Sequence, residues 1–181
     1  MMVYVLLGTG FEETEAIAPI DLLRRAGISV QTVGLNGKIV YGGHGIGIEA
    51  DITPEEMDFS QMDMIVLPGG LGGVASILAC PQAMDAINYA YTHQRFIAAI
   101  CAAPTILAQL GITDGRSAVC YPGCEENMGT AQIVQDIPCI RDGHVITGTS
   151  AGCATAFALE LIRALKGDTA AQQVADQIVM R

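Results

Sequence analysis

Cys101 stands where a nucleophilic cysteine is expected, between a short apolar segment and a segment of helical composition. Residues 96–100 are typical of a buried strand, and residues 102–110 are typical of a helix that tolerates Pro104 in its first turn. At such a turn, unpaired backbone N–H groups and the positive end of the helix dipole favour a thiolate over a thiol. The sequence therefore predicts a nucleophilic Cys101 with a lowered pKa, although a single cysteine more often serves only packing.

Glu15 is the carboxylic acid whose position suggests a partner for this sulfur. It follows Glu12 and Glu13 in the first turn of a predicted helix, where the helix dipole alone explains acidic side chains. Glu15 differs from its neighbours because Pro19 lacks the N–H that would bond to the carbonyl of residue 15. If Glu15 faces the cleft, burial near the sulfur raises its pKa and allows it to donate a proton.

Two glycine-rich turns were considered as binding loops. The segment 8–10 lacks the third glycine of a dinucleotide fingerprint, and the acids that follow it would repel a pyrophosphate. Gly69 and Gly70 follow a predicted strand and Pro68. They are better explained as an oxyanion hole, in which backbone N–H groups approach a reacting oxygen.

Residues 148–152 match the Gly-x-Ser-x-Gly pattern of serine hydrolases. Those enzymes need an acid and a histidine after the serine, whereas the last histidine here, His144, precedes Ser150. We therefore reject a serine hydrolase and expect Ser150 to cap the closing helix. Of the other polar side chains, His44 in a glycine-rich loop and Tyr121 after a short strand are candidates to border the cleft.

Strand and helix signals alternate along the chain. This pattern predicts an α/β fold with a mainly parallel sheet covered on both faces, and ligands bind beyond the carboxyl ends of such strands. Strands are expected at 3–7, 29–33, 64–67, 96–100 and 118–120, helices at 12–26, 81–93, 102–110, 151–165 and 169–179, and hairpins at 38–49 and 139–147. The segments 8–15, 68–73, 101–104, 121–123 and 148–152 should then form one site.

Composition limits the possible partners. The 181 residues are 51% hydrophobic, enough for one domain over residues 1–181. No apolar run is long enough to span a bilayer, and no signal peptide precedes the first strand, so we expect a cytoplasmic protein. Nine basic residues against 19 acidic ones give a net charge of −10, which disfavours nucleic-acid and membrane partners.

The six cysteines contain no Cys-x-x-Cys pair, so neither a zinc site nor a disulfide framework is predicted. Cys120, Cys124 and Cys153 lie in segments near the expected site. One hypothesis is that one of them resolves an oxidised Cys101 as a disulfide. The other is that they are small core residues.

Three segments together have a specific spacing. They are the first helix with Glu12-Glu13-Thr14-Glu15, Pro19 and Arg24-Arg25-Ala26-Gly27, the loop Val66-Leu67-Pro68-Gly69-Gly70, and the turn Ala98-Ala99-Ile100-Cys101-Ala102-Ala103-Pro104. With them the chain resembles the ThiJ/PfpI superfamily over essentially its whole length, most closely the branch of the parkinsonism-associated protein DJ-one. The resemblance implies a flavodoxin-like three-layer sandwich, a homodimer, and a cysteine on a nucleophile elbow.

The resemblance also implies roles for individual residues. Cys101 matches the nucleophilic, oxidation-sensitive cysteine, and Glu15 matches the carboxylic acid that hydrogen-bonds to it. Gly69 and Gly70 match the loop that faces the sulfur, and Ala102 supplies the adjacent amide.

The chain departs from the family pattern at three positions. Tyr121 stands where the branch often has a histidine, and Thr149 stands where some relatives have an arginine. The hydrolase and amidotransferase relatives have a histidine directly after the cysteine, where this chain has Ala102. A peptidase of the PfpI type is therefore not expected.

The leading functional hypothesis is an enzyme that resembles glyoxalase III and the related deglycases. It would act on reactive small-molecule carbonyls, 2-oxoaldehydes such as methylglyoxal, and give 2-hydroxy acids without glutathione, another cofactor or a metal. Protection against oxidative stress is a possible role. The alternative is a non-catalytic redox sensor or chaperone that uses an oxidisable Cys101.

Overall fold

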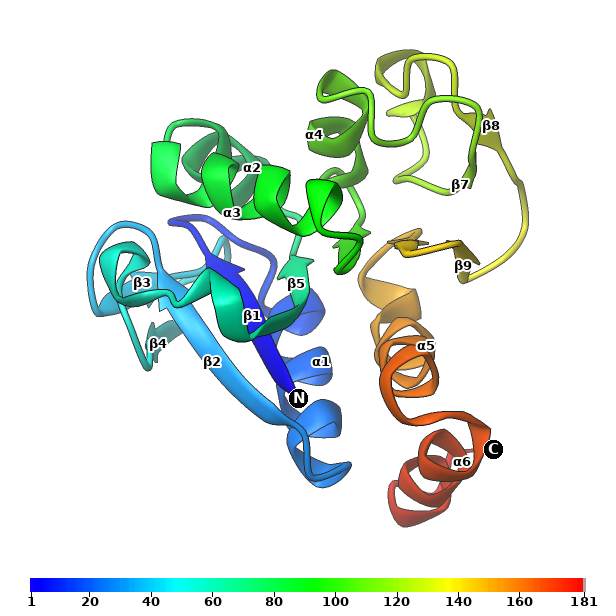
Figure 1. Cartoon of the computed structure of the whole chain (residues 1–181), viewed down its shortest axis with the longest axis horizontal. Coiled ribbons are helices and arrows are strands. Elements are labelled where there is room, and N and C mark those ends of the chain that lie inside the picture. The colour runs from blue at the N-terminus through cyan, green and yellow to red at the C-terminus, as the bar shows by residue number, and fades with distance from the viewer. Residues whose placement is uncertain (181) are drawn as a thin grey trace.

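The computed structural model describes residues 1–180 and contains a central sheet of six strands (Figure 1). The strand order is β2-β1-β5-β6-β10-β9, and β9 is antiparallel to β10 while the other neighbours are parallel. The bounds are β1 (Met2–Leu7), β2 (Ser29–Gly34), β5 (Met62–Leu67), β6 (Phe96–Ile100), β9 (Cys139–Asp142) and β10 (Val145–Gly148). The mainly parallel sheet that the sequence predicted is confirmed.

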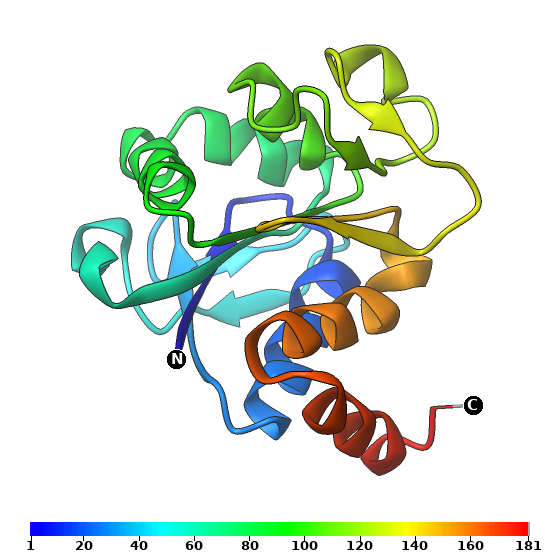
Figure 2. The same ribbon diagram turned by 45° about the vertical axis from the view of Figure 1, so that its right-hand side comes forward.

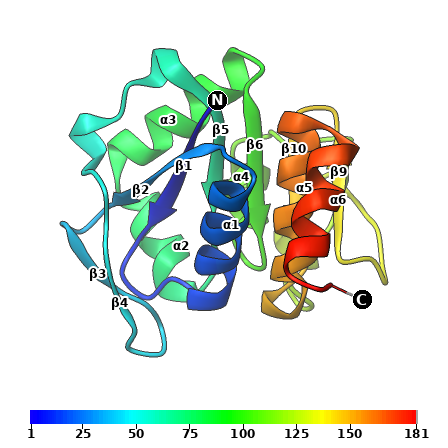
Figure 3. The same ribbon diagram turned by 90° about the horizontal axis from the view of Figure 1, so that it is seen from below.

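Helices cover both faces of this sheet, which Figure 2 shows nearly edge-on between two layers. One layer contains α1 (Glu13–Arg25), α5 (Ala154–Lys166) and α6 (Asp168–Gln177), which lie in front of the strands in Figure 3. The other layer contains α2 (Leu71–Leu78), α3 (Pro81–Thr92) and α4 (Pro104–Gln109). The predicted flavodoxin-like three-layer sandwich is therefore confirmed.

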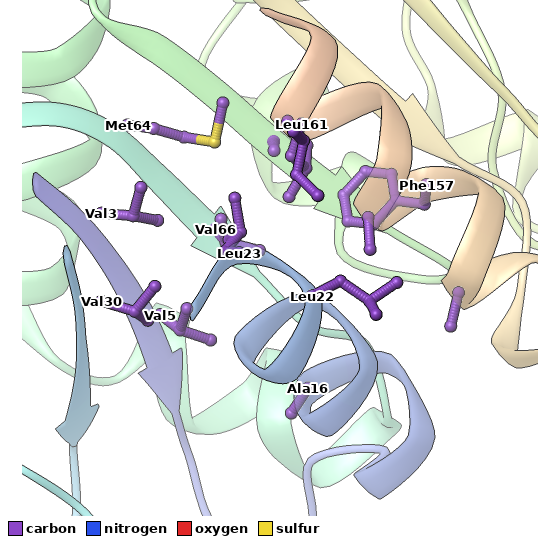
Figure 4. Close-up of a cluster of buried hydrophobic side chains, with 14 of the residues drawn as sticks. Val3, Val5, Ala16, Leu22, Leu23, Val30, Met64, Val66, Phe157 and Leu161 are labelled. Carbon is purple, nitrogen blue, oxygen red and sulfur yellow. The ribbon is translucent and has the colours of Figure 1, made fainter. Parts of the chain in front are cut away.

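Alternate residues of each strand enter two separate hydrophobic cores, because successive side chains of a strand point to opposite faces. Val3 and Val5 of β1 pack toward α1 and α5, in the cluster drawn in Figure 4. Tyr4 and Leu6 pack toward the opposite helical layer, where Ile87 of α3 is also fully buried. Each such side chain contributes about 1.5–3 kcal/mol when it leaves water. The two cores explain why the central strands read as continuous apolar runs.

Two hairpins lie at the margins of the sandwich, as the sequence predicted. The first pairs β3 (Ile39–Tyr41) with β4 (Gly47–Glu49), and the second joins β9 to β10 at Gly143. The described part of the chain also contains short 3₁₀ turns at Pro54–Glu56, Phe59–Gln61, Glu125–Asn127 and Ala151–Cys153.

Helix α2 was not expected, because two glycines within its first turn lower its helical propensity. Tertiary packing explains why it forms. A Cβ at Gly72 would lie 2.8 Å from the carbonyl oxygen of Thr9, and one at Gly73 would lie 2.8 Å from the Cα of Phe11. The glycines let α2 approach the loop after β1 closely, and this contact outweighs their local preference.

Two other expectations need correction. The predicted strand at 118–120 is only β7 (Ser117–Ala118), which pairs with β8 (Gln132–Ile133) outside the central sheet. Ser150 does not cap α5: a 3₁₀ turn intervenes, and the Ser150 side chain makes no capping hydrogen bond. Within residues 1–180, no helix is both long and apolar enough to cross a membrane.

Candidate active site

Cys101 occupies a sharp turn between β6 and the segment that leads to α4. Its φ angle is +67°, a left-handed conformation that costs on the order of 1–3 kcal/mol for a residue other than glycine. The backbone holds this conformation from both sides. The Cys101 N–H donates to the Gly148 carbonyl at 2.9 Å, and the Cys101 carbonyl accepts from the Tyr121 N–H at 2.8 Å. The elbow is therefore fixed by β10 on one side and by the segment after β7 on the other.

Glu15 lies in the first turn of α1 and is fully buried. Its Oε2 accepts a hydrogen bond from the Gly69 N–H at 2.9 Å. Its Oε1 is also buried and has no other polar partner within residues 1–180, and the group that interacts with this carboxyl is the Cys101 thiol, a contact that affects the pKa of both side chains. A buried carboxyl beside a thiol is suited to carry a proton, because protonation removes the cost of holding a charge away from water.

Gly69 and Gly70 allow the backbone to approach both reactive groups. A Cβ at Gly69 would lie 2.5 Å from Glu15 Oε2 and 2.7 Å from Cys101 Cβ, so these two side chains flank the same point of the loop. Gly70 has a φ of +83°, and a Cβ there would lie 2.5 Å from the Gly10 carbonyl oxygen. A side chain at Gly69 would clash with Cys101 and one at Gly70 with the backbone of Gly10, so a side chain at either position would displace the loop.

The electrostatics of the pair differ from the expectation of a thiol with a lowered pKa. Burial and the negative charge of Glu15 raise the pKa of the Cys101 thiol to about 12, while N–H groups of Ala102 and Gly70 act to lower it. Burial also raises the pKa of Glu15. The expectation is therefore wrong for Cys101 beside an ionised Glu15. The ionisation of each group opposes that of the other, so protonation of Glu15 removes the charge that opposes ionisation of the sulfur.

A pocket of about 300 Å³ opens above the sulfur. It is lined by Glu12, Gly70, Leu71, Cys101, Ala102, Tyr121 and Cys124. This volume suits a small molecule. Of the residues that the sequence singled out, the structure brings together Cys101, Glu15, the glycine loop, Ala102 and Tyr121.

Thr149 and His44, which were expected to line the site, are not among the residues that line this pocket. The Thr149 side chain donates to the carbonyl of Ile137 at 2.8 Å, and its N–H donates to the carbonyl of Pro138 at 3.0 Å. Thr149 thus anchors the chain before β9. No role in anion recognition is visible in these contacts.

His44 is held by the acidic turn that begins α1. Its Nδ1 lies 2.9 Å from Glu13 Oε2 and 3.5 Å from Glu12 Oε2, and its own N–H donates to Glu13 Oε1 at 2.7 Å. Potential ligand atoms of Glu12, Glu13 and His44 lie within 4.8 Å of one another, which is the spacing of a cation site. Ion pairing between the imidazole and the two carboxylates explains the same arrangement.

Of the three thiols considered as partners of Cys101, only Cys124 lines its pocket. Cys120 is buried, and Cys153 lies in the 3₁₀ turn before α5. All six cysteines are free.

Glu12 and Leu71 line the pocket and lie in two of the segments that were expected to form the site, but the sequence analysis did not single them out. The signal for Leu71 was its place directly after Gly70, because a residue next to a loop that faces the sulfur must border the same opening. Glu12 had been explained by the helix dipole alone, although its N–H donates to the Gly69 carbonyl at 3.0 Å and so ties it to that loop.

Comparisons with known proteins agree with the fold described above. A model of the DJ-1/PfpI family matches residues 1–164. Protein dj-1beta of Drosophila melanogaster is 36% identical over 178 residues, which cover 97% of this chain and 95% of the relative. The crystal structure of Drosophila melanogaster DJ-1beta matches with a TM-score of 0.94 and covers 99% of this chain and 98% of that chain.

Of two relatives with lower sequence identity, one is named for an activity and the other for an oxidation state. A protein of Pyrococcus abyssi named a deglycase is 28% identical over 167 residues, which cover 92% of this chain and 100% of the relative. A structure of Toxoplasma gondii DJ-1, described as oxidized, has a TM-score of 0.91 and 27% identity, and covers 98% of this chain and 97% of that chain.

Proposed function

Because the chain belongs to the DJ-1/PfpI family, we propose that it is a cysteine-dependent enzyme that converts 2-oxoaldehydes such as methylglyoxal to 2-hydroxy acids. The observation that carries this proposal is the fully buried Glu15 carboxyl beside a strained Cys101 elbow at the base of a small pocket. The deglycase name of the Pyrococcus abyssi relative supports the same class of reactive carbonyl substrate.

In the first step, Cys101 Sγ forms a bond to the aldehyde carbon while the Glu15 carboxylate takes the thiol proton. The aldehyde oxygen becomes an alkoxide. The N–H groups of Gly70 and Ala102, which donate toward the sulfur, are close enough to stabilise this charge. Transfer of the proton from Glu15 to the alkoxide gives a hemithioacetal and restores the carboxylate.

In the second step, Glu15 removes the proton from the carbon bonded to sulfur, and the electron pair passes to the neighbouring ketone to form an enediolate. The hydroxyl proton moves from the former aldehyde oxygen to the neighbouring oxygen, and Glu15 returns its proton to the former ketone carbon, which leaves a thioester. Water then hydrolyses the thioester and releases the 2-hydroxy acid and the Cys101 thiol. The aldehyde carbon is oxidised and the ketone carbon is reduced within one molecule, so the reaction consumes one water and needs no external oxidant or reductant.

The test is to measure lactate formation from methylglyoxal by the wild type, Cys101→Ala and Cys80→Ala. Cys80 is a partly exposed free thiol outside the pocket, so it controls for the loss of a cysteine. We expect Cys101→Ala to fall to the rate without enzyme and Cys80→Ala to match the wild type. Full turnover by Cys101→Ala would exclude the proposal.

A second candidate is a redox sensor or chaperone that uses oxidation of Cys101, and it is favoured by the buried Glu15 carboxyl that interacts with the sulfur. A protonated Glu15 carboxyl has an O–H group that would donate a hydrogen bond to an oxygen of a cysteine sulfinate. Treatment with mild peroxide, followed by intact mass and activity measurements, separates the two. A stable gain of about 32 Da on Cys101, without any turnover of glyoxals, would favour the sensor.

We also propose a homodimer in a reducing compartment such as the cytoplasm. Six free thiols fit such a compartment. Ile17 of α1 and Ile46 after β3 are exposed and line one shallow hollow, which a second copy would cover. Sedimentation of the wild type and Ile17→Glu tests the dimer: we expect two chains per particle for the wild type and dissociation in the variant, and a monomeric wild type would exclude it.

A further inference from the structure

Two of the residues that line the Cys101 pocket are exposed, and both have large apolar side chains. Leu71 and Tyr121 therefore border the opening of the pocket, whereas Cys101 and Gly70 are less exposed and Ala102 is buried. A three-carbon 2-oxoaldehyde has five non-hydrogen atoms, each of which takes about the 30 Å³ or less of a liquid water. It would therefore occupy about half or less of the 300 Å³ available and leave the opening unfilled.

Leu71 is the more unusual of the two residues. It is 83% exposed, although it begins α2 and is followed by Gly73 and Ile77, which that helix buries. At 100° per residue, Leu71 lies on the side of the helix opposite to those two residues. Single exposed leucines are common on protein surfaces. Leu71, however, lies next to the glycine that faces the sulfur, so its exposed side chain belongs to the pocket and not to the core.

Tyr121 is fixed to the elbow through its backbone. Its N–H donates to the Cys101 carbonyl at 2.8 Å, and its own carbonyl accepts from the Cys124 N–H at 2.9 Å. Its side chain remains 49% exposed. An aromatic side chain on a fixed backbone has few rotatable bonds, so it offers a large apolar contact at a low entropic cost.

Charge restricts the pocket further. Glu12 is an acidic residue that lines it, and no lysine or arginine among residues 1–180 does so. The chain as a whole has a net charge of −10. An anionic substrate would approach Glu12 and the Cys101–Glu15 pair. The cation beside Glu12 is His44, whose Nδ1 lies 3.5 Å from Glu12 Oε2 but only 2.9 Å from Glu13 Oε2, so it compensates the charge of Glu12 only in part.

We propose that this pocket selects uncharged 2-oxoaldehydes whose ketone carbon carries a bulky apolar substituent, aryl or branched alkyl, which packs on Leu71 and Tyr121. The proposal rests on the glyoxal chemistry proposed above and specifies the substrate class of the same site. Burial of Leu71 by the substituent adds binding energy that a methyl group cannot supply. Glu12 excludes the anionic members of the class.

The first test compares kcat/KM for phenylglyoxal and methylglyoxal in the wild type, Leu71→Ser and Leu78→Ser. Leu78 is the matched control, because it is 39% exposed on the same helix and does not line the pocket. We expect Leu71→Ser to lower the phenylglyoxal to methylglyoxal ratio about tenfold and Leu78→Ser to leave both values unchanged. An unchanged ratio in Leu71→Ser would overturn the proposal.

The second test probes the charge. The wild type should prefer phenylglyoxal over 4-carboxyphenylglyoxal, and Glu12→Gln should reduce that preference about threefold to tenfold. Equal use of the neutral and anionic substrates by the wild type would overturn the role of Glu12.

A third measurement does not depend on turnover. The rates at which N-phenylmaleimide and N-ethylmaleimide alkylate Cys101, followed by peptide mass, should show a phenyl preference that Leu71→Ser reduces and Leu78→Ser retains. If Leu71→Ser left the ratio of the two alkylation rates unchanged, only the proposed apolar contact at the pocket opening would be overturned. Absence of turnover with every 2-oxoaldehyde would instead overturn the proposed enzyme, and the substrate class with it, whatever the maleimide result.

Discussion

The Glu15 carboxylate raises the pKa of the Cys101 thiol beside it, so the two groups compete for one proton. Replacement of Glu15 by Gln keeps an acceptor for the Gly69 N–H but removes the charge. We expect the pKa of Cys101 to fall in Glu15→Gln, and its alkylation by iodoacetamide at pH 8 to become faster. Turnover of methylglyoxal should nevertheless fall about 10²-fold to 10⁴-fold, because the proton acceptor is lost.

In Glu15→Gln the alkylation rate of Cys101 should therefore rise while the turnover of methylglyoxal falls. Iodoacetamide rates measured from pH 6 to 10 give the pKa, and circular dichroism confirms the fold. A rise in the pKa of Cys101 in Glu15→Gln would contradict this account, since it would mean that a protonated Glu15 stabilises the thiolate in the wild type.

The contact between Glu13 and His44 predicts a pH-dependent stability. Burial alone would raise the pKa of Glu13, but hydrogen bonds from His44 and nearby N–H groups lower it overall from 4.5. The same contact raises the pKa of His44 above 6.5. The lowered carboxyl pKa stabilises the fold above about pH 4.5 and is lost on acidification. The raised imidazole pKa stabilises it below about pH 6.5 and is lost as the pH rises through the folded value.

We therefore expect the difference in Tm between the wild type and His44→Gln to be largest near pH 5–6 and to shrink by pH 9. The measurement is thermal unfolding at several pH values. Glu13→Gln and the double variant provide the control. In the Glu13→Gln background, His44→Gln should no longer change Tm in a pH-dependent way, because the ion pair is already lost. A difference in Tm that stays constant from pH 5 to 9 would rule out the ion pair.

The backbone conformation and close contacts of Gly70 indicate that Gly70→Ala would lower the free energy of unfolding substantially. Gly70 and Gly167 both have a φ of +83°, so Ala at either position pays for an unfavourable conformation, on the order of 1–3 kcal/mol. A Cβ at Gly70 would also meet the Gly10 carbonyl at 2.5 Å and the Glu12 nitrogen at 2.6 Å, whereas nothing lies within 4 Å at Gly167. Gly70→Ala should therefore destabilise more than Gly167→Ala, by about a further 1–3 kcal/mol.

Urea unfolding of both variants measures this difference. Activity should also separate them: Gly70→Ala should lose turnover because a displaced loop no longer holds the Gly70 N–H at the sulfur, and Gly167→Ala should retain it. Equal destabilisation by the two substitutions would show that the close approach of the loop has no energetic consequence.

The sequence predicted those parts of the site that depend on local signals. The apolar strand, the small residues and Pro104 indicated the elbow, and Pro19 distinguished Glu15 from the acids before it. The raised pKa of Cys101 could not be read in the same way. It depends on a buried carboxyl that α1 and the glycine loop bring to the sulfur from distant parts of the chain.

Long-range contacts also explain the parts of the pocket that the sequence left open. His44 was expected near the cleft because of its glycine-rich loop. The β3–β4 hairpin places it on Glu13, a partner that lies 31 residues away, and 3.5 Å from Glu12, which lines the pocket. Leu71 was not singled out because α2 forms only through close packing of its glycines on Phe11 and Thr9. Patterns over a few residues contain no information about such contacts.

Cys124 gives the last prediction, because it and Cys101 line the same pocket. Backbone hydrogen bonds from Tyr121 to Cys101 and from Cys124 to Tyr121 tie the two segments together.

Peroxide would oxidise Cys101 to a sulfenic acid with release of water. Attack by the Cys124 thiol would then form a disulfide with release of a second water. We expect one equivalent of peroxide to lower the intact mass by about 2 Da, reversibly with reductant. Cys124→Ser should instead gain oxygen, while Cys120→Ser, which removes a buried thiol outside the pocket, should behave as the wild type. If the wild type gains about 32 Da and no disulfide peptide is found, Cys124 is not a resolving cysteine.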